Sequence, residues 1–248
     1  MDLWDKKILS YDDSESLFRT LVYKIGLHFG LRAREEHRAL EWERQIKLHT
    51  DPVDGKDYLL YTEDFSKTNQ GGLKHRFITP KSVKVYEDKD SNRCLVKLYK
   101  LYRSHRPDST KTTAFYLQPI PTPKGKTWFK DQPVGINKIG GVVSNIMKEI
   151  DPDGHYTNHS LKRTCYSRLR QAGISTDQSM KRTGHRSVDG AMEYDVQSKQ
   201  EAEKQDHILN GHQTASPAVN LDMNGKLSSC SVEICITKPN GEVVNIKL

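Results

Sequence analysis

The sequence predicts an α+β fold that is mainly α-helical, and three patterns lead to this prediction. Apolar residues recur at about one helical turn in several segments, which is the spacing of amphipathic helices. Residues 45–87 instead contain short segments in which apolar and polar residues alternate, on both sides of a glycine-containing turn. This pattern predicts a small antiparallel sheet. Residues 231–248 alternate around Pro239-Asn240-Gly241 and predict a β-hairpin in a C-terminal tail.

The first two predicted helices cover residues 12–29 and 31–42, with Gly30 between them. Asp13 or Ser14 can accept hydrogen bonds from the free backbone N–H groups at the start of the first helix. The first helix has a regular apolar stripe, whereas the second is heavily charged. Both patterns are compatible with a helix, and Gly30 suits the break between the two.

Three short segments form the predicted sheet: residues 45–49, 57–64 and 73–78. Residues 66–72 connect the last two segments, and Gly71-Gly72 suits a tight hairpin turn. The sequence therefore predicts a β-hairpin that carries a polar, lysine-containing tip.

Further helices are predicted at residues 91–104 and 136–150. The intervening residues 114–135 contain four prolines, which predict one strand followed by an ordered loop. We expect Trp128 and Phe129 to anchor this loop on the core.

The composition is that of a polar globular protein with a basic excess. Lysine and arginine number 39 against 32 acidic residues, a net charge of +7 that favours a polyanionic partner. No apolar run is long enough for a membrane span and no signal peptide is evident, so we expect nucleus or cytosol, not secretion. Four cysteines without a C-x-x-C pair argue against a structural zinc site, and no metal or cofactor is expected.

Candidate chemistry gathers in residues 158–195. His159 and Lys162 are three residues apart on a predicted helix, so they share one face. Gly184-His185 follows a short amphipathic segment, and Tyr194 lies nine residues after His185. Two histidines and a lysine suit an anion, above all a phosphate, and a tyrosine beside an activated phosphate is a candidate nucleophile.

This stretch resembles the catalytic end of the tyrosine recombinases, the phage-integrase family. Their pattern is His-x-Leu-Arg-x-Thr on a helix, then Gly-His, then the nucleophilic tyrosine nine residues later. The chain matches it with His159, His185 and Tyr194 but has Lys162 at the arginine position, with Arg163 one step out of register. The local sequence around these residues is most similar to that of Crypton-type transposon recombinases and host proteins derived from them, including C-terminal domains of MYM-type zinc-finger proteins.

The resemblance extends over about residues 3–196 and implies further site residues. Arg32 matches the first catalytic arginine and Glu35 its supporting acid, although a solvated helix arginine is the plain alternative. Lys67, in the predicted hairpin, matches the lysine that protonates the leaving oxygen, and an exposed hairpin lysine is the alternative there. Tyr194 would attack the phosphodiester to form a 3′-phosphotyrosine, while Lys162 in place of arginine would weaken or abolish that step.

The predicted organisation is a catalytic domain in residues 1–200, a polar linker in 201–230 and the hairpin tail in 231–248. The expected partner is DNA, with a tetramer on two sites if the chain is active, and no membrane or small-molecule substrate. The family also has an N-terminal helical domain that closes around DNA, and this sequence begins almost at the catalytic domain. The alternatives are a domesticated, inactive module that binds DNA or nuclear proteins, and an unrelated interaction domain in which Tyr194 belongs to the core.

Overall fold

The computed structural model describes residues 3–64, 80–88, 91–151, 153, 155–185, 187–192 and 194, and the backbone of two C-terminal strands. The chain divides into two compact units, Met1–Ser198 and Lys199–Leu248. The helices of the first unit are α1 (Ser14–Phe29), α2 (Ala33–Arg38), α3 (Leu95–His105), α4 (Ile136–Lys148), α5 (Asn158–Gln171), α6 (Thr176–Thr183) and α7 (Val188–Met192). Its strands are β1 (Ile46–Thr50), β2 (Asp57–Thr62), β3 (Ser82–Tyr86), β4 (Leu117–Pro119) and β5 (Phe129–Pro133). The α+β, mainly helical fold class is thereby confirmed.

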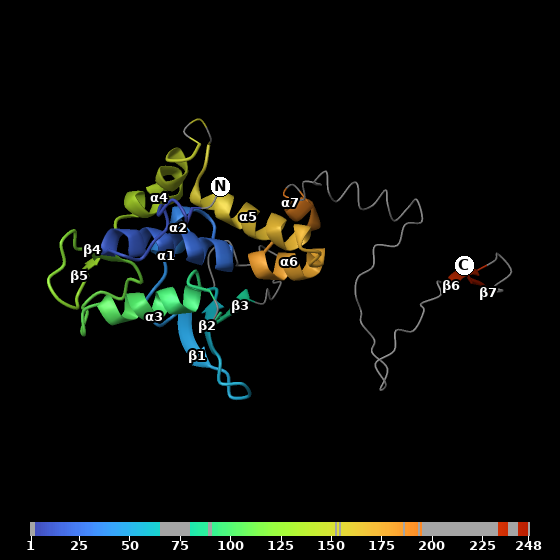
Figure 1. Cartoon of the computed structure of the whole chain (residues 1–248), viewed down its shortest axis with the longest axis horizontal. Coiled ribbons are helices and arrows are strands. Elements are labelled where there is room, and N and C mark those ends of the chain that lie inside the picture. Colours follow the sequence, from blue (N-terminus) through green and yellow to red (C-terminus); the bar gives the residue numbers. More distant parts are fainter. Residues whose placement is uncertain are drawn as a thin grey trace, which may run out of the picture. The chain divides into compact units, whose positions relative to one another are not determined.

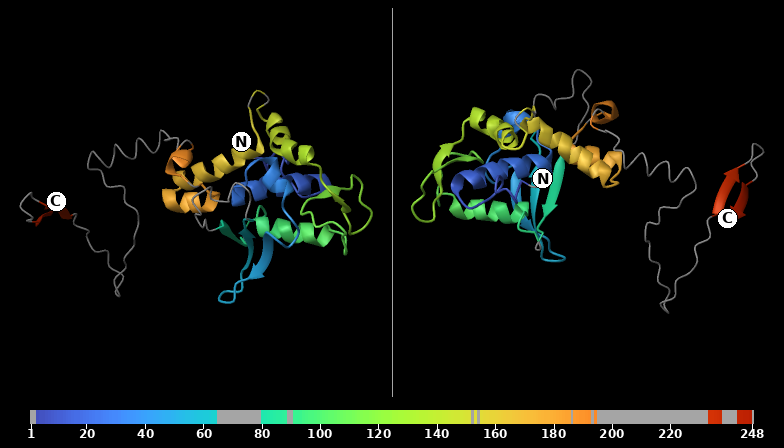
Figure 2. Two further views of the ribbon diagram at one scale, coloured as in Figure 1. Left: turned by 180° about the vertical axis from the view of Figure 1, so that it is seen from behind. Right: turned by 45° about the horizontal axis from the view of Figure 1, so that its top comes forward.

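Helix α1 is the centre of the core of the first unit. It contacts α3, α4 and α5, with α4 on one side of it and α3 and the β1–β3 sheet on the other (Figures 1 and 2). The Asp13 carboxylate accepts hydrogen bonds from the backbone N–H groups of Glu15 and Ser16, both at 2.9 Å, and so caps the helix. Its apolar stripe is fully buried, which confirms the predicted helix over residues 12–29.

The three-stranded antiparallel sheet has the order β1-β2-β3. Its register pairs Leu48 with Leu59 and Tyr61 with Val83, so that Leu59, Tyr61 and Val83 face the core. The strand predicted at residues 73–78 and the predicted hairpin tip lie outside the described residues. The third strand seen is β3, which the sequence reading did not single out.

The charged helix predicted over residues 31–42 is much shorter than expected, because only α2 is helical. Arg32 is extended (φ −81°, ψ 155°), and its backbone N–H donates to the Glu36 carboxylate at 2.6 Å, which starts the helix there. After α2, the Trp42 N–H donates to the Thr113 carbonyl at 2.7 Å, and the Trp42 ring packs against the core.

The proline-containing segment holds a second strand, β5, which pairs with β4. Prolines at the ends of both strands hid this pairing from the sequence pattern. Phe129 is fully buried and Trp128 stacks on His105 with ring centres 3.7 Å apart, so both anchor the segment as expected.

In the second unit, β6 (Glu233–Thr237) and β7 (Val243–Lys247) pair antiparallel, the predicted C-terminal hairpin. The domain limits at residues 200 and 230 stay predictions. Across the described part of the chain, no helix has the length and apolar character needed to cross a membrane.

Candidate functional site

Helix α5 supplies the central side chains of the site, and its first turn is held firmly. The Thr157 and Ser160 side chains form a reciprocal capping box with each other's backbone N–H groups. The Asn158 side chain donates to the Ile139 carbonyl of α4 at 3.1 Å. His159, which follows, therefore starts from a fixed backbone.

Tyr194 reaches the site from the turn after α7. Its hydroxyl and His159 Nε2 lie 3.0 Å apart, within hydrogen-bond distance. Its backbone N–H donates to the Ala191 carbonyl, and its carbonyl accepts from the Ser167 hydroxyl, both at 3.0 Å. Helices α5 and α7 thus place the predicted nucleophile against the predicted histidine.

His185 follows Gly184, which ends α6 in the left-handed conformation (φ 73°). The Thr183 hydroxyl donates to the Ser179 carbonyl at 2.8 Å, so it must accept from His185 Nδ1 at 2.7 Å. This arrangement leaves Nε2 of neutral His185 as a proton acceptor. Nε2 is buried and has no hydrogen-bond partner in the described part of the structure, and the ring centre is 5.1 Å from that of Tyr194.

The site is strongly positive. Lys162 is only 3% exposed, and burial, Arg32 and Lys81 together lower its pKa to about 7. Burial, followed by the charges of Lys162 and Arg32, lowers the pKa of His185 to about 4 and also lowers the pKa of His159. Both histidines are therefore neutral at pH 7 and able to accept a proton, in surroundings that favour a bound anion.

Arg32 lies at the start of α2, close enough for its charge to lower the pKa values of His159, Lys162 and His185. The predicted supporting acid, Glu35, is turned elsewhere, because its carboxylate pairs with Arg34 Nε at 3.1 Å. The structure gives the position beside Arg32 to Glu36, which accepts from the Arg32 backbone N–H. The charge of Glu36 also opposes the pKa shifts of His159 and Lys162, and Glu63 opposes that of Lys162 as well.

Lys67 lies outside the described residues, whereas Lys81 is a site neighbour that sequence reasoning missed. Lys81 Nζ donates to the Phe29 carbonyl at the end of α1, at 2.6 Å. Its side chain packs against Gly184, where an added Cβ would lie 3.0 Å from Lys81 Cδ. No motif marks Lys81, because its role depends on the carbonyl of a helix end far away in the sequence.

Two further cations complete the surroundings. The Arg163 guanidinium lies 5.3 Å from the centre of the Tyr194 ring, so Arg163 reaches the tyrosine even though its helix position differs from that of Lys162. Arg182 donates to the carbonyls of His28 and Lys84, each at 3.0 Å, which ties α6 to α1 and β3. Among the residues described, no His, Cys, Asp and Glu side chains are grouped to hold a metal ion.

A close approach of two helix ends brings these parts together. Gly30 ends α1 in the left-handed conformation (φ 57°), and a Cβ there would lie 3.1 Å from Thr183 Cα. Only glycine fits both the backbone conformation and the space. The Gly30–Thr183 contact therefore sets how near the end of α6, just before His185, comes to the end of α1.

The arrangement of helices and sheet is the tyrosine-recombinase catalytic domain fold. The site-specific recombinase XerH, bound to palindromic difH substrate in a post-cleavage complex, matches with a TM-score of 0.56 at 15% identity, over 84% of this chain and 50% of that one. The chain belongs to the family described as a domain of unknown function (DUF3504), whose model matches residues 1–148.

Two human proteins are similar in sequence. Uncharacterized protein KIAA1958 is 25% identical over 158 residues, 60% of this chain and 21% of that protein. Zinc finger MYM-type protein 2 is 29% identical over 129 residues, 47% of this chain and 9% of that protein. The chain thus spans a small part of each relative. The expected likeness to MYM-type proteins is present.

Proposed function

We propose that the chain is a DNA-binding domain that cleaves and rejoins a DNA strand through a 3′-phosphotyrosine on Tyr194. The observation that carries the proposal is the 3.0 Å contact of the Tyr194 hydroxyl with His159, beside the buried cation Lys162. A phosphodiester repels nucleophiles through its negative charge, so a cationic pocket around a nucleophile suits this substrate.

The proposed step is a transesterification, in which atoms and electrons balance without a co-reactant. The Tyr194 oxygen forms a bond to phosphorus, and the phenol proton goes to Nε2 of a neutral histidine, His159 by the direct contact. The bond from phosphorus to the 5′ oxygen breaks. By the family resemblance Lys67 gives the leaving oxygen its proton, and Arg32 and Lys162 hold the nonbridging oxygens. The reverse reaction reseals the strand.

His185 has a separate role in this proposal. Its Nε2 is buried and has no hydrogen-bond partner among the described residues, and the charges of Lys162 and Arg32 act on the ring. When an anion binds, His185 can take up a proton and hold the phosphate, or it can share the phenol proton with His159. The proposal extends to a DNA-bound tetramer in the nucleus and to descent from a Crypton-type transposon, as the sequence resemblance implies.

The second candidate function is a domesticated module that binds nuclear DNA or protein without cutting. Lys162 favours it, because a lysine lacks the bidentate fork of arginine and a pKa of about 7 leaves it only partly charged at neutral pH. A weak or absent reaction would leave the basic surface intact for binding.

Covalent trapping on nicked half-site DNA tests the proposal, because the cleaved end diffuses away and the phosphotyrosine accumulates. Wild type should give a denaturant-resistant adduct, Tyr194→Phe should give none, and Tyr166→Phe should keep it. Tyr166 is the matched control, since its ring lies in the same site, 6.5 Å from that of Tyr194.

Other outcomes choose between the candidates. An adduct in Lys162→Arg alone indicates a catalytic scaffold disabled at one position. No adduct in any variant, together with salt-sensitive DNA binding, supports the inactive module. Loss of the adduct in Tyr166→Phe but not in Tyr194→Phe contradicts the assigned nucleophile. No DNA binding at all contradicts strand cleavage and leaves only the protein-binding form of the inactive module.

A further inference from the structure

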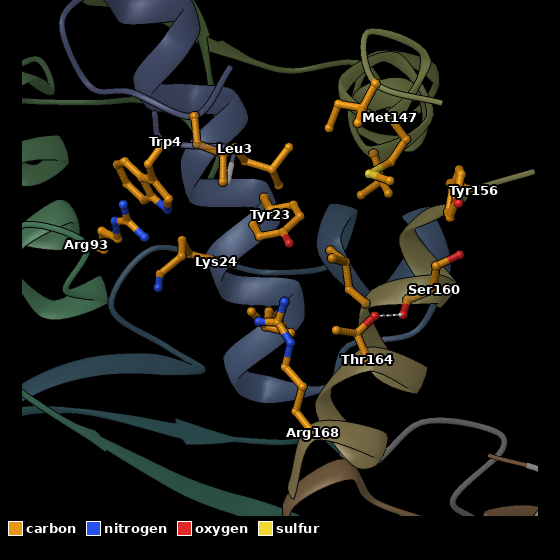
Figure 3. A pocket seen from close by; sticks show the side chains of 15 residues that line it. Leu3, Trp4, Tyr23, Lys24, Arg93, Met147, Tyr156, Ser160, Thr164 and Arg168 are labelled. Carbon is orange, nitrogen blue, oxygen red and sulfur yellow. Dashed lines mark hydrogen bonds between the residues drawn. The ribbon is translucent and has the colours of Figure 1, made fainter. Parts of the chain in front are cut away.

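A cavity of about 770 Å³ lies on the side of α5 that faces away from Tyr194. The N-terminal segment, α1, α4 and α5 line it (Figure 3). This volume is typical of sites for small organic ligands. The cavity shares no lining residue with the tyrosine site, whose side chains leave α5 in the opposite direction.

Three cations from separate elements converge on this cavity: Lys24 of α1, Arg168 of α5, and Arg93 just before α3 (Figure 3). The described lining residues include no aspartate or glutamate. Arg93 pairs with Asp5 at 3.3 Å, a residue outside the lining. Burial is the main cause that lowers the pKa of Lys24; Cys94 opposes this shift, and the charges of Arg168 and Arg93 add to it.

The rest of the cavity is apolar and aromatic. Met147 of α4 stands across the cavity from Lys24, with Val143, Ile150 and Leu161 also in the lining (Figure 3). Trp4 and Tyr23 add aromatic surface. A bare inorganic anion would not contact this apolar wall. A neutral apolar ligand would provide no counter-charge for Lys24 and Arg168.

We propose that this cavity binds an amphipathic organic anion, whose carboxylate, sulfonate or phosphate group contacts Lys24 and Arg168 and whose apolar body packs against α4. Convergent cations in a half-buried space repel one another, and a ligand anion converts that repulsion into charge-assisted hydrogen bonds. The apolar body supplies the remaining affinity by leaving water. The inference is independent of strand cleavage at Tyr194.

Fluorescence titration with 1-anilinonaphthalene-8-sulfonate tests the proposal, because this probe has both an aromatic body and an anion. N-phenyl-1-naphthylamine is its matched neutral analogue, and inorganic phosphate is the matched bare anion. We expect saturable binding of the sulfonate at one site, weaker binding of the neutral analogue, and competition by phosphate only at much higher concentration.

Variants locate the binding. Lys24→Met should weaken sulfonate binding about 10- to 100-fold, as expected for loss of a charged hydrogen-bond partner. Lys148→Met removes the same charge from the exposed end of neighbouring α4 and should change nothing. Met147→Trp, which fills the apolar side and keeps every cation, should also abolish binding, with thermal melting to verify that each variant is folded.

Several results would overturn the proposal. Equal affinity for the neutral analogue, or unchanged affinity in Lys24→Met, would show that the site does not recognise the anionic group. Equal potency of phosphate and the sulfonate would show that the apolar body of the ligand does not contribute to binding. Displacement of the probe by duplex DNA, reduced in Lys24→Met, would make the cavity a DNA phosphate contact instead.

Discussion

The two sides of α5 present different surroundings for a positive charge. On one side, Lys162 is almost fully buried, and its charge acts on His159, which contacts the tyrosine hydroxyl. On the other, Arg168 is exposed at a cavity that also holds half-buried Lys24 and an apolar wall. Both sides carry positive charge, but of the two only the first combines it with neutral histidines that can accept a proton. Positive charge alone indicates an anion-binding site, whereas a proton acceptor beside a candidate nucleophile is what a catalytic site needs in addition.

The largest expected effect is at Lys162. Lys162→Arg should raise the yield or rate of the covalent adduct about 100- to 1,000-fold, because it restores a permanently charged, bidentate donor to the phosphate. Adduct formation on half-site DNA measures the change. Lys24→Arg, the same substitution on the other side of α5, should leave the adduct unchanged. Equal effects of the two substitutions would mean that the comparison of the two sides is mistaken.

Replacing Lys162 or Lys24 by an apolar residue should stabilise the fold, and the gain in the free energy of unfolding should be larger at Lys162. Its pKa falls from 10.5 to about 7 on folding. Lys162→Met should therefore raise the free energy of unfolding at pH 6 by about 2–4 kcal/mol, given about 1.4 kcal/mol per pKa unit. Lys24→Met should give a smaller gain, because Lys24 is less buried. Urea denaturation of wild type and both variants measures the difference.

The pH dependence of that gain follows from proton binding. Below pH 7, Lys162 is charged in both folded and unfolded chains, and the folded chain bears the full cost of burying the charge. Between pH 7 and 10.5 the folded state loses the proton first, so wild-type stability rises with pH. The advantage of Lys162→Met should shrink over this window. An advantage that is constant from pH 6 to 10 would show that Lys162 keeps its ordinary pKa.

The sequence predicted most of what depends on local pattern. Helices α1 and α5 were predictable, because long apolar stripes and capping residues mark them. The spacing of His159 and Lys162 predicted that they share one face of α5, whereas the family resemblance predicted that His185 and Tyr194 join them. The chemical roles of these residues stay predictions.

Contacts between distant segments could not be predicted. Lys81 enters the site because the Phe29 carbonyl accepts from its ammonium, and nothing near Lys81 in the sequence indicates this contact. Glu36, not Glu35, accepts from the backbone N–H of Arg32, because the backbone of Arg32 is extended and aims its N–H at the second acid. Strand β5 was missed because Pro133 at its end and the prolines earlier in the segment are typical of a loop.

Gly26 sets the distance between α1 and α5, and its substitution should affect the two sides of α5 unequally. A Cβ at Gly26 would lie 2.6 Å from Leu161 Cδ1 and 3.1 Å from Nε2 of buried His37. Alanine normally stabilises a helix interior by roughly 0.5–1 kcal/mol relative to glycine. Overpacking costs about 1–3 kcal/mol, so Gly26→Ala should lower the free energy of unfolding by about 1 kcal/mol.

Because Leu161 lines the cavity and does not reach Tyr194, Gly26→Ala should also weaken sulfonate binding while adduct formation stays near wild type. Gly135→Ala is the control, since an added Cβ there meets nothing within 4 Å. Denaturation and probe titration on the same samples measure both effects. If Gly26→Ala stabilises the protein, the Leu161 side chain rotates away freely and the packing between α1 and α5 is looser than the distances imply. If adduct formation falls together with probe binding, the two sides of α5 are mechanically coupled through this contact.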